Sequence, residues 1–296
     1  MRVEVGRGVP ARSCQSDCSF SYTNIVRYSF EVLEPYRQIT QGGLLRRMFS
    51  EMGSLEAKSL LDEHQRIWLK KPSLRLVYQY YYDLAFSNSI PGRTLEIGAG
   101  SGSLRHCGFE VISTDIVHTS NVDVVSDAHA LPFTNSSVNN IVAVDVFHHL
   151  QRPIRFLQEA NRLLQPGGRL LLIEPAITIL SRSVFRLFHS EPFDMNVDVL
   201  ADGELSRKRN PFDANQALGT VLATKDRKRL PNHVSGLRIS KIQWTGSIAY
   251  PLSGGFRKWC LLPKVMLKPI LLLESVIDKY FGRFVAFRLL LVITKD

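Results

Sequence analysis

Short apolar runs alternate with more polar connections through the middle of the chain. The runs occupy residues 94–97, 109–115, 122–126, 138–144 and 169–175. Each run is too short for an ordinary helix and is bounded by turn-forming or acidic residues, so each predicts a buried strand. Strands that alternate with connections in this way favour an α/β fold with a doubly wound, parallel sheet and right-handed crossovers.

The segments on either side of these strands have other patterns. Residues 1–28 lack periodicity and are rich in Arg, Ser, Gly and Cys, so we expect them to be poorly ordered. Apolar residues at helical spacing predict helices within 29–90. Residues 176–235 break the alternation, and an insertion at this point lies over the carboxyl ends of the strands, where ligands bind. The expected divisions are 1–28, a helical segment at 29–90, a core at 91–175, a substrate cap at 176–235 and a C-terminal part at 236–296.

The net charge is +10, from 37 Lys or Arg and 27 Asp or Glu, and it is unevenly distributed. The core at 91–175 holds six Lys or Arg and eight Asp or Glu, so the positive excess lies wholly in the flanking segments. A slightly acidic core suits a cationic ligand, and basic flanks suit an anionic substrate or surface. Solvation of surface helices explains the same charge without a ligand.

Neither a secretory signal nor a spanning helix is readable. The first thirty residues have no apolar core segment, and no run of about 18 uncharged apolar residues occurs. The four cysteines are scattered, which favours a reducing compartment, and no cluster of metal ligands is readable. We expect a cytoplasmic protein, or one attached to the inner face of a membrane from one side.

The first predicted strand breaks into Gly98, Gly100 and Gly102, three glycines spaced two residues apart. Glycine lets the backbone adopt positive φ and lets a ligand approach the main chain. Glu96 is a carboxylate near the end of this strand, where a purely structural role gives little reason for a charge. A ligand with hydrogen-bond donors or positive charge explains it. A nicotinamide-binding loop would have glycine at position 103 and no acid near the pyrophosphate, but this chain has Ser103 and Glu96.

An acid also ends the second predicted strand. Asp115 lies seventeen residues beyond Gly98, where a doubly wound sheet places an acid that accepts both ribose hydroxyls of an adenosine ligand. Capping of the next element is the structural alternative. Only twelve residues separate Gly102 from Asp115 and six separate Asp115 from Val122. Because a parallel crossover normally needs a dozen or more residues, this spacing predicts a very short first helix and allows the second to be absent.

Taken in order, these motifs resemble the class I S-adenosylmethionine-dependent methyltransferases of the type 11 group. The resemblance covers residues 94–175 and includes the E-x-G-x-G-x-G loop, the Leu-Pro-Phe segment at 131–133, the His-His-Leu segment at 148–150 and the Pro-Gly-Gly turn at 166–168. It implies a mostly parallel seven-stranded sheet with an antiparallel last strand, an N-terminal helical lid and a cap after the fifth strand. The implied cofactor is S-adenosyl-L-methionine.

The resemblance also implies roles for individual residues. Glu96 would help to hold the ammonium end of the cofactor, Asp127 would accept the exocyclic amine of adenine, and the Ala128 backbone would meet an adenine ring nitrogen. Asp145 would wall the methionine site, whereas His129 is expected at the surface. The full set of cofactor-binding residues expected here is Glu96, Gly98, Ala99, Gly100, Gly102, Asp115, Ile116, Asp127, Ala128 and Asp145.

Two histidines follow the fourth predicted strand at the mouth of the expected cleft. His148 and His149 are the candidate catalytic bases for a hydroxyl or amine acceptor, because imidazole titrates near neutrality. Family members with different substrates carry histidines at the same place, so helix capping or pocket shaping is the alternative role. No metal is expected.

The sequence thus predicts methyl transfer to a small-molecule or lipid-linked acceptor, for which the basic flanks allow an anionic character. The alternatives are a non-catalytic module that associates with a membrane or partner and, less favoured, a nicotinamide-dependent oxidoreductase. No nucleic acid is expected, because no RNA-binding module flanks the core, and the sequence indicates no oligomeric state. A predicted helix at 263–280 either covers the sheet, which we favour, or makes peripheral contact with an anionic membrane.

Overall fold

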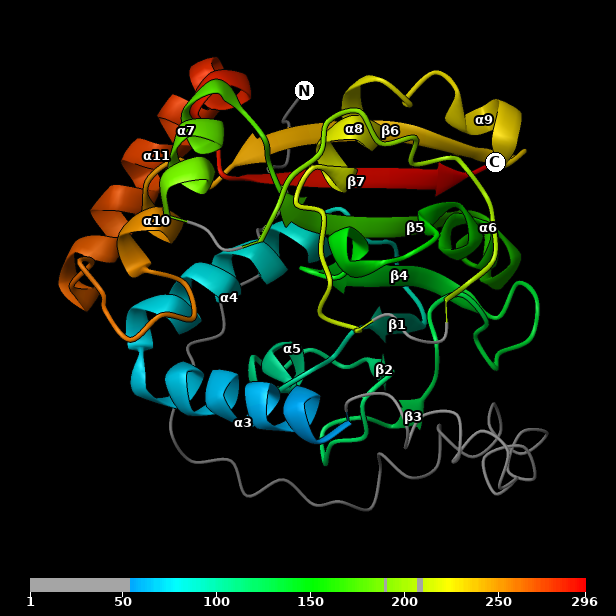
Figure 1. Cartoon of the computed structure of the whole chain (residues 1–296), viewed down its shortest axis with the longest axis horizontal. Helices are drawn as coiled ribbons and strands as arrows, with labels where there is room; N and C mark the ends of the chain where they lie inside the picture. Colours follow the sequence, from blue (N-terminus) through cyan, green and yellow to red (C-terminus); the bar gives the residue numbers. More distant parts are fainter. Residues whose placement is uncertain (1–53, 189–190, 207–209) are drawn as a thin grey trace, which may run out of the picture.

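The computed structural model describes residues 54–188, 191–206 and 210–296, and its sheet has the strand order β3-β2-β1-β4-β5-β7-β6 (Figure 1). The first five strands pair in parallel, and β7 lies antiparallel between β5 and β6. This arrangement confirms the predicted mostly parallel, seven-stranded α/β sheet. The strands are β1 (Thr94–Ile97), β2 (Ile112–Asp115), β3 (Val124–Val125), β4 (Val138–Val144), β5 (Leu164–Pro175), β6 (Leu237–Thr245) and β7 (Arg288–Lys295).

Helices cover both faces of the sheet because its central strands are apolar on both sides. In β4, Ile141 and Ala143 pack into one buried cluster, and Val142 between them packs into the other. The first cluster includes side chains of α6 (Pro153–Leu163), α8 (Leu218–Thr224) and α9 (Leu230–His233). The second includes side chains of α4 (Pro72–Phe86) and α10 (Ala249–Ser253). The other helical elements are α3 (Ser54–Lys70), α5 (Ser103–His106), the 3-10 turn η2 (Phe147–His149), α7 (Ile179–Phe188) and α11 (Lys264–Val285).

The connections between the first strands have the lengths that the spacing predicted. The four-residue helix α5 joins β1 to β2, and the fully described connection from β2 to β3 contains no helix. Within the described residues the chain begins with α3, which packs against α4 and lies beside α5 (Figure 1). The segment 1–28, the predicted helical residues 29–53 and the basic run at 207–209 lie outside the described residues.

Several predicted boundaries are wrong for identifiable reasons. β2 begins at Ile112 and not at 109, because the Phe109 ring stacks on Phe86 of α4 with centroids 4.2 Å apart. β3 is only two residues long, since Asp123 before it accepts the Ser113 backbone N–H at 2.9 Å. The apolar run that predicts the last strand starts at Phe284, but β7 begins at Arg288 because α11 continues to Val285.

The helix α11 packs against β6, as the favoured interpretation predicts, but only along a narrow stripe. Its 22 residues include only three buried ones, Leu267, Glu274 and Gly282. A helix that covers a sheet buries a broad apolar stripe, but most apolar side chains of α11 are exposed to solvent. A search for spans over the described residues finds no helix with the length and hydropathy needed to cross a bilayer.

Candidate functional site

The loop after β1 has the conformation that its glycines allow. Gly98, Gly100 and Gly102 have φ values of +70°, +51° and +75°, in the left-handed region that other residues rarely adopt. A Cβ at Gly98 would lie 2.3 Å from a methyl carbon of Val146, and a Cβ at Gly102 would lie 2.5 Å from the Cβ of Asn121. The backbone conformation therefore requires glycine at all three positions. At Gly98 and Gly102 the close approach of a neighbouring side chain also leaves no space for a Cβ.

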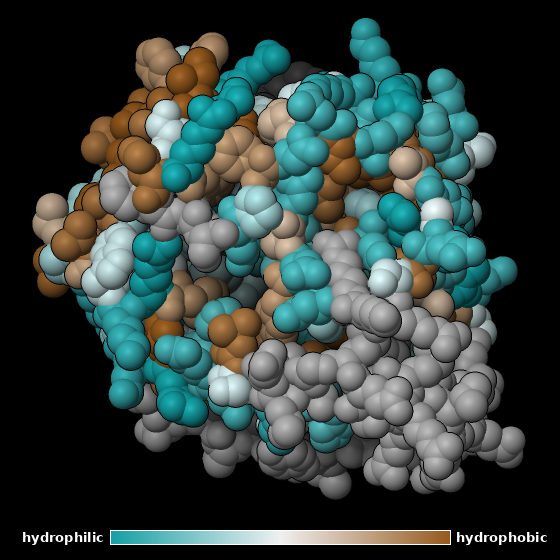
Figure 2. Space-filling view, viewed as in Figure 1, coloured by the Kyte–Doolittle hydropathy of each residue, from teal (hydrophilic) through white to brown (hydrophobic). Residues whose placement is uncertain are grey.

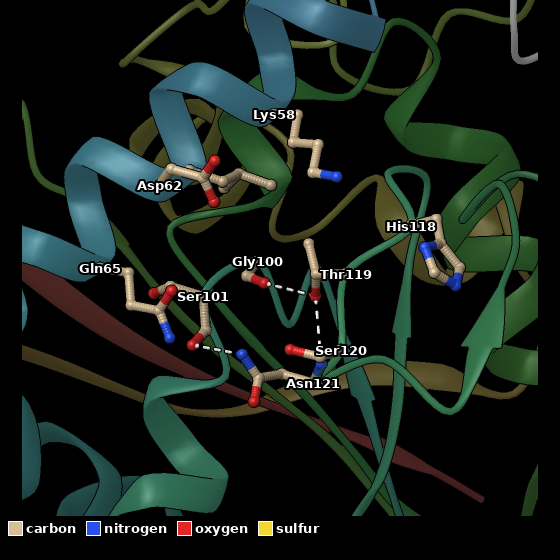
Figure 3. Close-up of a pocket in the computed structure, with 10 residues that line it drawn as sticks. Lys58, Asp62, Gln65, Gly100, Ser101, His118, Thr119, Ser120 and Asn121 are labelled. Atoms are coloured by element: carbon tan, nitrogen blue, oxygen red, sulfur yellow. Dashed lines mark hydrogen bonds between the residues drawn. The ribbon is translucent and has the colours of Figure 1, made fainter.

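A pocket with a volume of about 320 Å³ lies between this loop and α3 (Figure 3). The loop side of the pocket is fixed by hydrogen bonds: the Thr119 hydroxyl donates to the Gly100 carbonyl at 3.2 Å, and the Asn121 amide donates to the Ser101 carbonyl at 3.0 Å. A pocket of this size is within the range that holds small ligands. Its lining includes Lys58, Leu61, Gln65, Gly100, Ser101 and Asn121.

The carboxylate of Glu96 is buried within the sheet, not in the lining of this pocket. It accepts a hydrogen bond from the Ser113 hydroxyl at 2.6 Å across the β1–β2 pair. Burial raises the pKa of Glu96 to about 7, against the opposing effects of that hydrogen bond and of Arg105. Its predicted contact with the cofactor ammonium stays a prediction.

The carboxylate of Asp115 fixes the loop from the tip of β2. One oxygen accepts the Gly100 backbone N–H at 2.7 Å, and the other accepts the Val117 N–H at 2.8 Å. Burial raises the pKa of Asp115, and these hydrogen bonds oppose the rise. Each carboxylate oxygen can accept a second hydrogen bond, so the side chain retains the capacity to accept ribose hydroxyls. The adjoining Ala99 is buried, and its N–H donates to the Thr114 carbonyl at 3.0 Å.

The residues expected around adenine lie beyond Asp115 on the same side of the sheet. Ile116 and Ala128 are half-buried. Asp127 pairs with His129, whose ring nitrogen lies 2.6 Å from the carboxylate, and the His129 side chain is only 9% exposed. The expectation that His129 lies at the surface is therefore wrong. Burial raises the pKa of Asp127, whereas the hydrogen bonds and the charge of His129 lower it. The second effect is larger, so the net pKa shift of Asp127 is downward.

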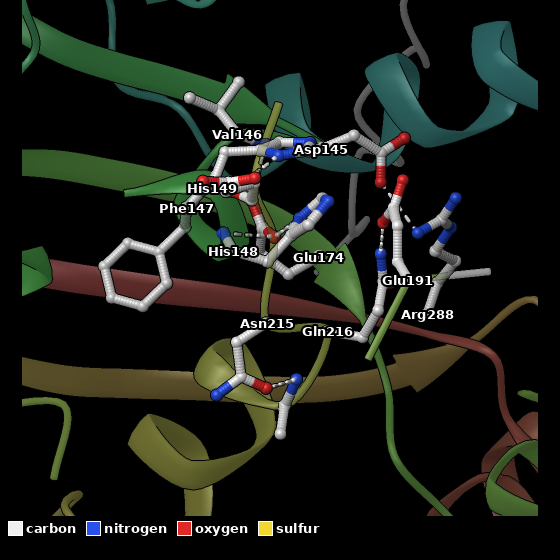
Figure 4. Close-up of polar contacts among 12 residues, drawn as sticks. Asp145, Val146, Phe147, His148, His149, Glu174, Glu191, Asn215, Gln216 and Arg288 are labelled. Carbon is white, nitrogen blue, oxygen red and sulfur yellow. Dashed lines mark hydrogen bonds and ion pairs between the residues drawn. The ribbon is translucent and has the colours of Figure 1, made fainter. Parts of the chain in front are cut away.

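A second polar cluster begins at the carboxyl end of β4 (Figure 4), where Val146 lies against Gly98 of the glycine loop. Asp145 has a φ of +57°, and its carboxylate accepts the Tyr78 hydroxyl at 2.7 Å and forms a 2.7 Å ion pair with Arg288. The Arg288 guanidinium also lies over the Tyr250 ring, 4.0 Å from its centroid. Burial lowers the pKa of Arg288, but Asp145 and the surrounding tyrosines raise it by more. The cluster thus contains a permanent cation, Arg288, that is paired with Asp145.

His148 is held by a buried carboxylate. Its Nδ1 lies 2.6 Å from Glu174 at the end of β5, and both side chains are almost fully buried. Glu174 also accepts the backbone N–H groups of Val146, Phe147 and His148. Burial lowers the pKa of His148, but Glu174 raises it by more. This geometry favours a role in shaping the turn η2, and proton transfer by His148 stays a prediction.

Residues of the cap complete this cluster. Glu191 contacts the Gln216 amide and lies beside Asp145 and Arg288 in the close-up (Figure 4). His149 is half-buried. Its ring lies tilted against that of His148, with centroids 4.1 Å apart, and its Nδ1 lies 3.4 Å from the Asp213 carbonyl. The cap therefore reaches the carboxyl ends of the strands, next to the glycine loop.

The sequence interpretation missed several members of this cluster. Arg288 is a single charge within an apolar run, the signal that identified Glu96, and the same reasoning would have found it. Tyr78 is one of several tyrosines on α4, and only the fold shows which of them meets Asp145. His64 on α3 stacks on Phe256 at 4.5 Å, and burial lowers its pKa; no sequence pattern pointed to it.

The described residues contain no group of three or more His, Cys, Asp or Glu side chains that could hold a metal ion. The loop conformation, the adjoining pocket and the acid at the tip of β2 do fit an adenosine-containing cofactor such as S-adenosylmethionine. The main chain of the glycine loop, together with Asp115, would hold it.

Comparison with known proteins gives one family and several partial relatives. A family described as a methyltransferase domain matches residues 56–214. The malonyl-[acyl-carrier protein] O-methyltransferase of Hahella chejuensis is 28% identical over 115 residues, which cover 33% of this chain and 40% of that protein. The enzyme of the same name from Methylococcus capsulatus is 35% identical over 99 residues, which cover 27% of this chain and 36% of that protein. The chain thus spans less than half of the length of either relative.

A solved structure shares the fold over most of the chain. A SAM-dependent methyltransferase from Thermotoga maritima superimposes with a TM-score of 0.51 at 17% identity, and the match covers 81% of this chain and 98% of that chain. At this identity the likeness concerns the arrangement of helices and strands.

Proposed function

This chain belongs to the methyltransferase domain family, whose methyl donor is S-adenosylmethionine, and from that premise we propose that it methylates a hydroxyl or amine of a small-molecule or lipid-linked acceptor. The observation that carries the proposal is the contact between the glycine loop and the polar cluster that begins at Asp145. Gly98 of the cofactor loop packs against Val146, and the neighbouring Asp145 begins the polar cluster under the cap. An acceptor bound in that cluster would lie next to a cofactor on the loop.

The charges of the cluster support a neutral or cationic acceptor. Two carboxylates, Asp145 and Glu191, lie near one guanidinium, Arg288, which is already paired with Asp145. An incoming carboxylate would be repelled by Glu191 and would have to compete with Asp145 for Arg288. The two relatives are named for methylation of a malonyl carrier protein, so this acceptor differs from the one that their names indicate. It also departs from the anionic character that the basic flanks allowed.

S-adenosylmethionine, when bound, supplies a methyl group on a positively charged sulfur. The acceptor oxygen or nitrogen forms a bond to this methyl carbon as the bond from carbon to sulfur breaks, and the acceptor loses a proton. We assign that proton to Glu191, whose carboxylate lies in the cluster beside Asp145 and Arg288; His149 is the second candidate. Alignment of the two reactants can supply about 7–11 kcal/mol of the acceleration in favourable cases.

A set of acceptors that differ in one functional group tests the proposal. Protein with labelled S-adenosylmethionine is incubated with an alkyl alcohol, an alkyl amine and an alkyl carboxylic acid of equal chain length. We expect labelled methyl ether or methylamine and no methyl ester. A methyl ester as the main product would overturn the assignment of the acceptor class.

A matched pair of variants tests the role of the cap carboxylate. Glu191→Gln should lower kcat by about 10²-fold or more while leaving S-adenosylmethionine binding unchanged. Glu204→Gln, an exposed glutamate of the same cap, should leave both unchanged. Equal rates for Glu191→Gln and the unmodified protein would show that Glu191 does not accept the proton. His149 would then be the remaining candidate, and the rate of His149→Ala tests it.

A further inference from the structure

The helices α7 and α11 together present a large exposed apolar surface (Figure 2). On α11 the exposed fractions reach 82% for Val265 and 72% for Leu272, and on α7 they reach 72% for Ile179 and 75% for Leu187. Contiguous apolar surfaces of this kind mark interaction sites on proteins. We define the α7–α11 face by its exposed apolar residues Ile179, Leu187, Val265, Leu272, Val276 and Tyr280.

The packing of α11 explains why its apolar side chains face outward. The helix is attached to the rest of the protein along a narrow stripe, of which Leu267, Glu274 and Gly282 are the buried members. A Cβ at Gly282 would lie 2.9 Å from the Cβ of Trp244, so the helix backbone lies close against β6. Val265, Leu272 and Val276 lie about half a turn away from that stripe, at 3.6 residues per turn. They are exposed because the opposite side of the helix is the one that packs against the protein.

The charges of α11 are divided in the same way. Its two acids both face inward: Glu274 accepts the N–H groups of Ile248 and Ala249, and Asp278 accepts from Gly246 and Ser247. Its basic residues, by contrast, are exposed beside the apolar side chains. They are Lys264, Lys268, Lys279 and Arg283, and α7 adds Arg182 and Arg186. The described surface of both helices is therefore apolar and basic, with no exposed acid.

A basic pocket adjoins the C-terminal end of α11. It has a volume of about 410 Å³, and its lining includes Ile242 and Trp244 of the edge strand β6. Its lining contains four basic side chains and no acidic one, and one of the four, Arg283, belongs to α11. Negative charge thus suits both the helix and the pocket at its end.

We propose that the α7–α11 face binds the surface of an anionic lipid bilayer. An amphipathic helix with lysine or arginine beside an apolar face lies in the interface of such a membrane, with its apolar side chains among the acyl chains and its cations near the anionic headgroups. The proposal is independent of the acceptor, because binding to lipid is measured without methyl transfer.

Charge argues against the two other occupants of this face. Residues 1–53 contain seven Lys or Arg and five Asp or Glu, so this segment does not complement a basic surface. A second copy of the same face would bring six basic side chains of α7 and α11 against six others. An anionic bilayer covers the apolar side chains and neutralises the cations at once.

Vesicle flotation tests the proposal with the full chain. The protein is mixed with vesicles of neutral phosphatidylcholine alone, or of phosphatidylcholine with about one-third phosphatidylserine, a fraction that gives a strongly negative surface. We expect flotation with the anionic vesicles only, weakened by added salt. Leu272→Glu and the double variant Lys264→Glu/Lys268→Glu should each reduce the bound fraction about tenfold or more.

Matched controls separate lipid binding from loss of fold. Leu69→Glu replaces an equally prominent leucine, 64% exposed on α3, and should float like the unmodified protein. All variants should keep the same thermal unfolding midpoint, since the substituted side chains are exposed. The proposal is overturned by protein that floats with neither vesicle, by equal flotation of the double variant, or by a dimer in solution that Leu272→Glu dissociates.

Discussion

Four residues in the left-handed region of φ meet where β1 and β4 end. Gly98, Gly100 and Gly102 bend the cofactor loop, and Asp145 turns the chain after β4. Aspartate tolerates this conformation better than most residues, and the bonds from Tyr78 and Arg288 hold it there. Local backbone conformation therefore brings the glycine loop and the polar cluster around Asp145 together.

The first prediction compares two glycines that have similar φ but different surroundings. Gly98→Ala places a Cβ 2.3 Å from Val146, whereas Gly108→Ala, at φ +84°, meets nothing within 4 Å. We expect Gly108→Ala to lower the free energy of unfolding by about 1 kcal/mol and Gly98→Ala to lower it by about 3 kcal/mol. Urea unfolding measures both; equal losses would show that the contact with Val146 is not tight.

The second prediction concerns the buried carboxyl of Glu96. Burial raises its pKa in the folded protein to about 7 from an ordinary value of 4.5. A raised pKa means that the folded state binds the proton more tightly, so this stabilisation is complete below about pH 4.5 and is lost as pH rises through about 7. The unfolding free energy of the unmodified protein relative to Glu96→Gln should fall by on the order of 3 kcal/mol over that range. A difference that stays constant between pH 5 and pH 8 would contradict the assignment.

At the scale of elements, α3 lies between the pocket beside the glycine loop and the polar cluster around Asp145. Leu61 and Gln65 line the pocket, and the Leu61 side chain lies 3.4 Å from the position of a Cβ at Gly100. His64, between them in sequence, stacks on Phe256, and Asp145 and Glu191 both act on its pKa. The helix thus forms one wall of the pocket, and His64 lies within electrostatic range of the cluster around Asp145.

The third prediction follows from this position of α3. Binding of S-adenosylmethionine should slow amide hydrogen exchange in α3, because a ligand in the pocket holds the helix against the glycine loop. Exchange in α6, which contributes no residue to the pocket, should not change. Mass spectrometry of exchanged peptides reports both; equal protection of the two helices would indicate a general stabilisation and not a contact with α3.

Elements were predictable where a single pattern determines them. The strand at 138–144 has the predicted bounds, because five of its seven residues are apolar and the unbroken apolar run at 141–144 fits a strand buried on both faces. The ends of β2 and β7 were not predictable, since Phe109 and Val285 are as apolar as strand residues. Only the tertiary contacts of Phe109 with Phe86, and the continuation of α11 to Val285, decide their state.

The candidate site was predictable to the same extent. The glycines and the acid Asp115 were found because their roles depend on backbone conformation and on the order of strands. Tyr78, Arg288 and Glu191 come from three distant parts of the chain, and only the folded structure brings them to Asp145. The exposed face of α11 was not predictable either, because a helical stripe does not show which of its sides is buried.

At the scale of the whole molecule, the charge and the layers divide the protein into parts with different tasks. The core at 91–175 is slightly acidic, and the basic excess lies in the flanks, including the exposed surface of α7 and α11. The helix α7 begins four residues after the end of β5, and Thr178, just before it, donates to the Ala286 carbonyl next to β7 at 3.0 Å. The basic, apolar face therefore starts close to the acceptor cluster.

Calorimetric titration of the full chain with S-adenosylmethionine, its demethylated product and NAD tests whether the chain binds the methyl donor. We predict micromolar binding of the first two and none of NAD. Asp115→Asn should weaken binding at least tenfold, because ribose loses a charged acceptor, while Asp83→Asn, an exposed aspartate of α4, should not. Absence of heat with both adenosyl ligands in folded protein, or equal binding by Asp115→Asn, would contradict the account and favour a non-catalytic module.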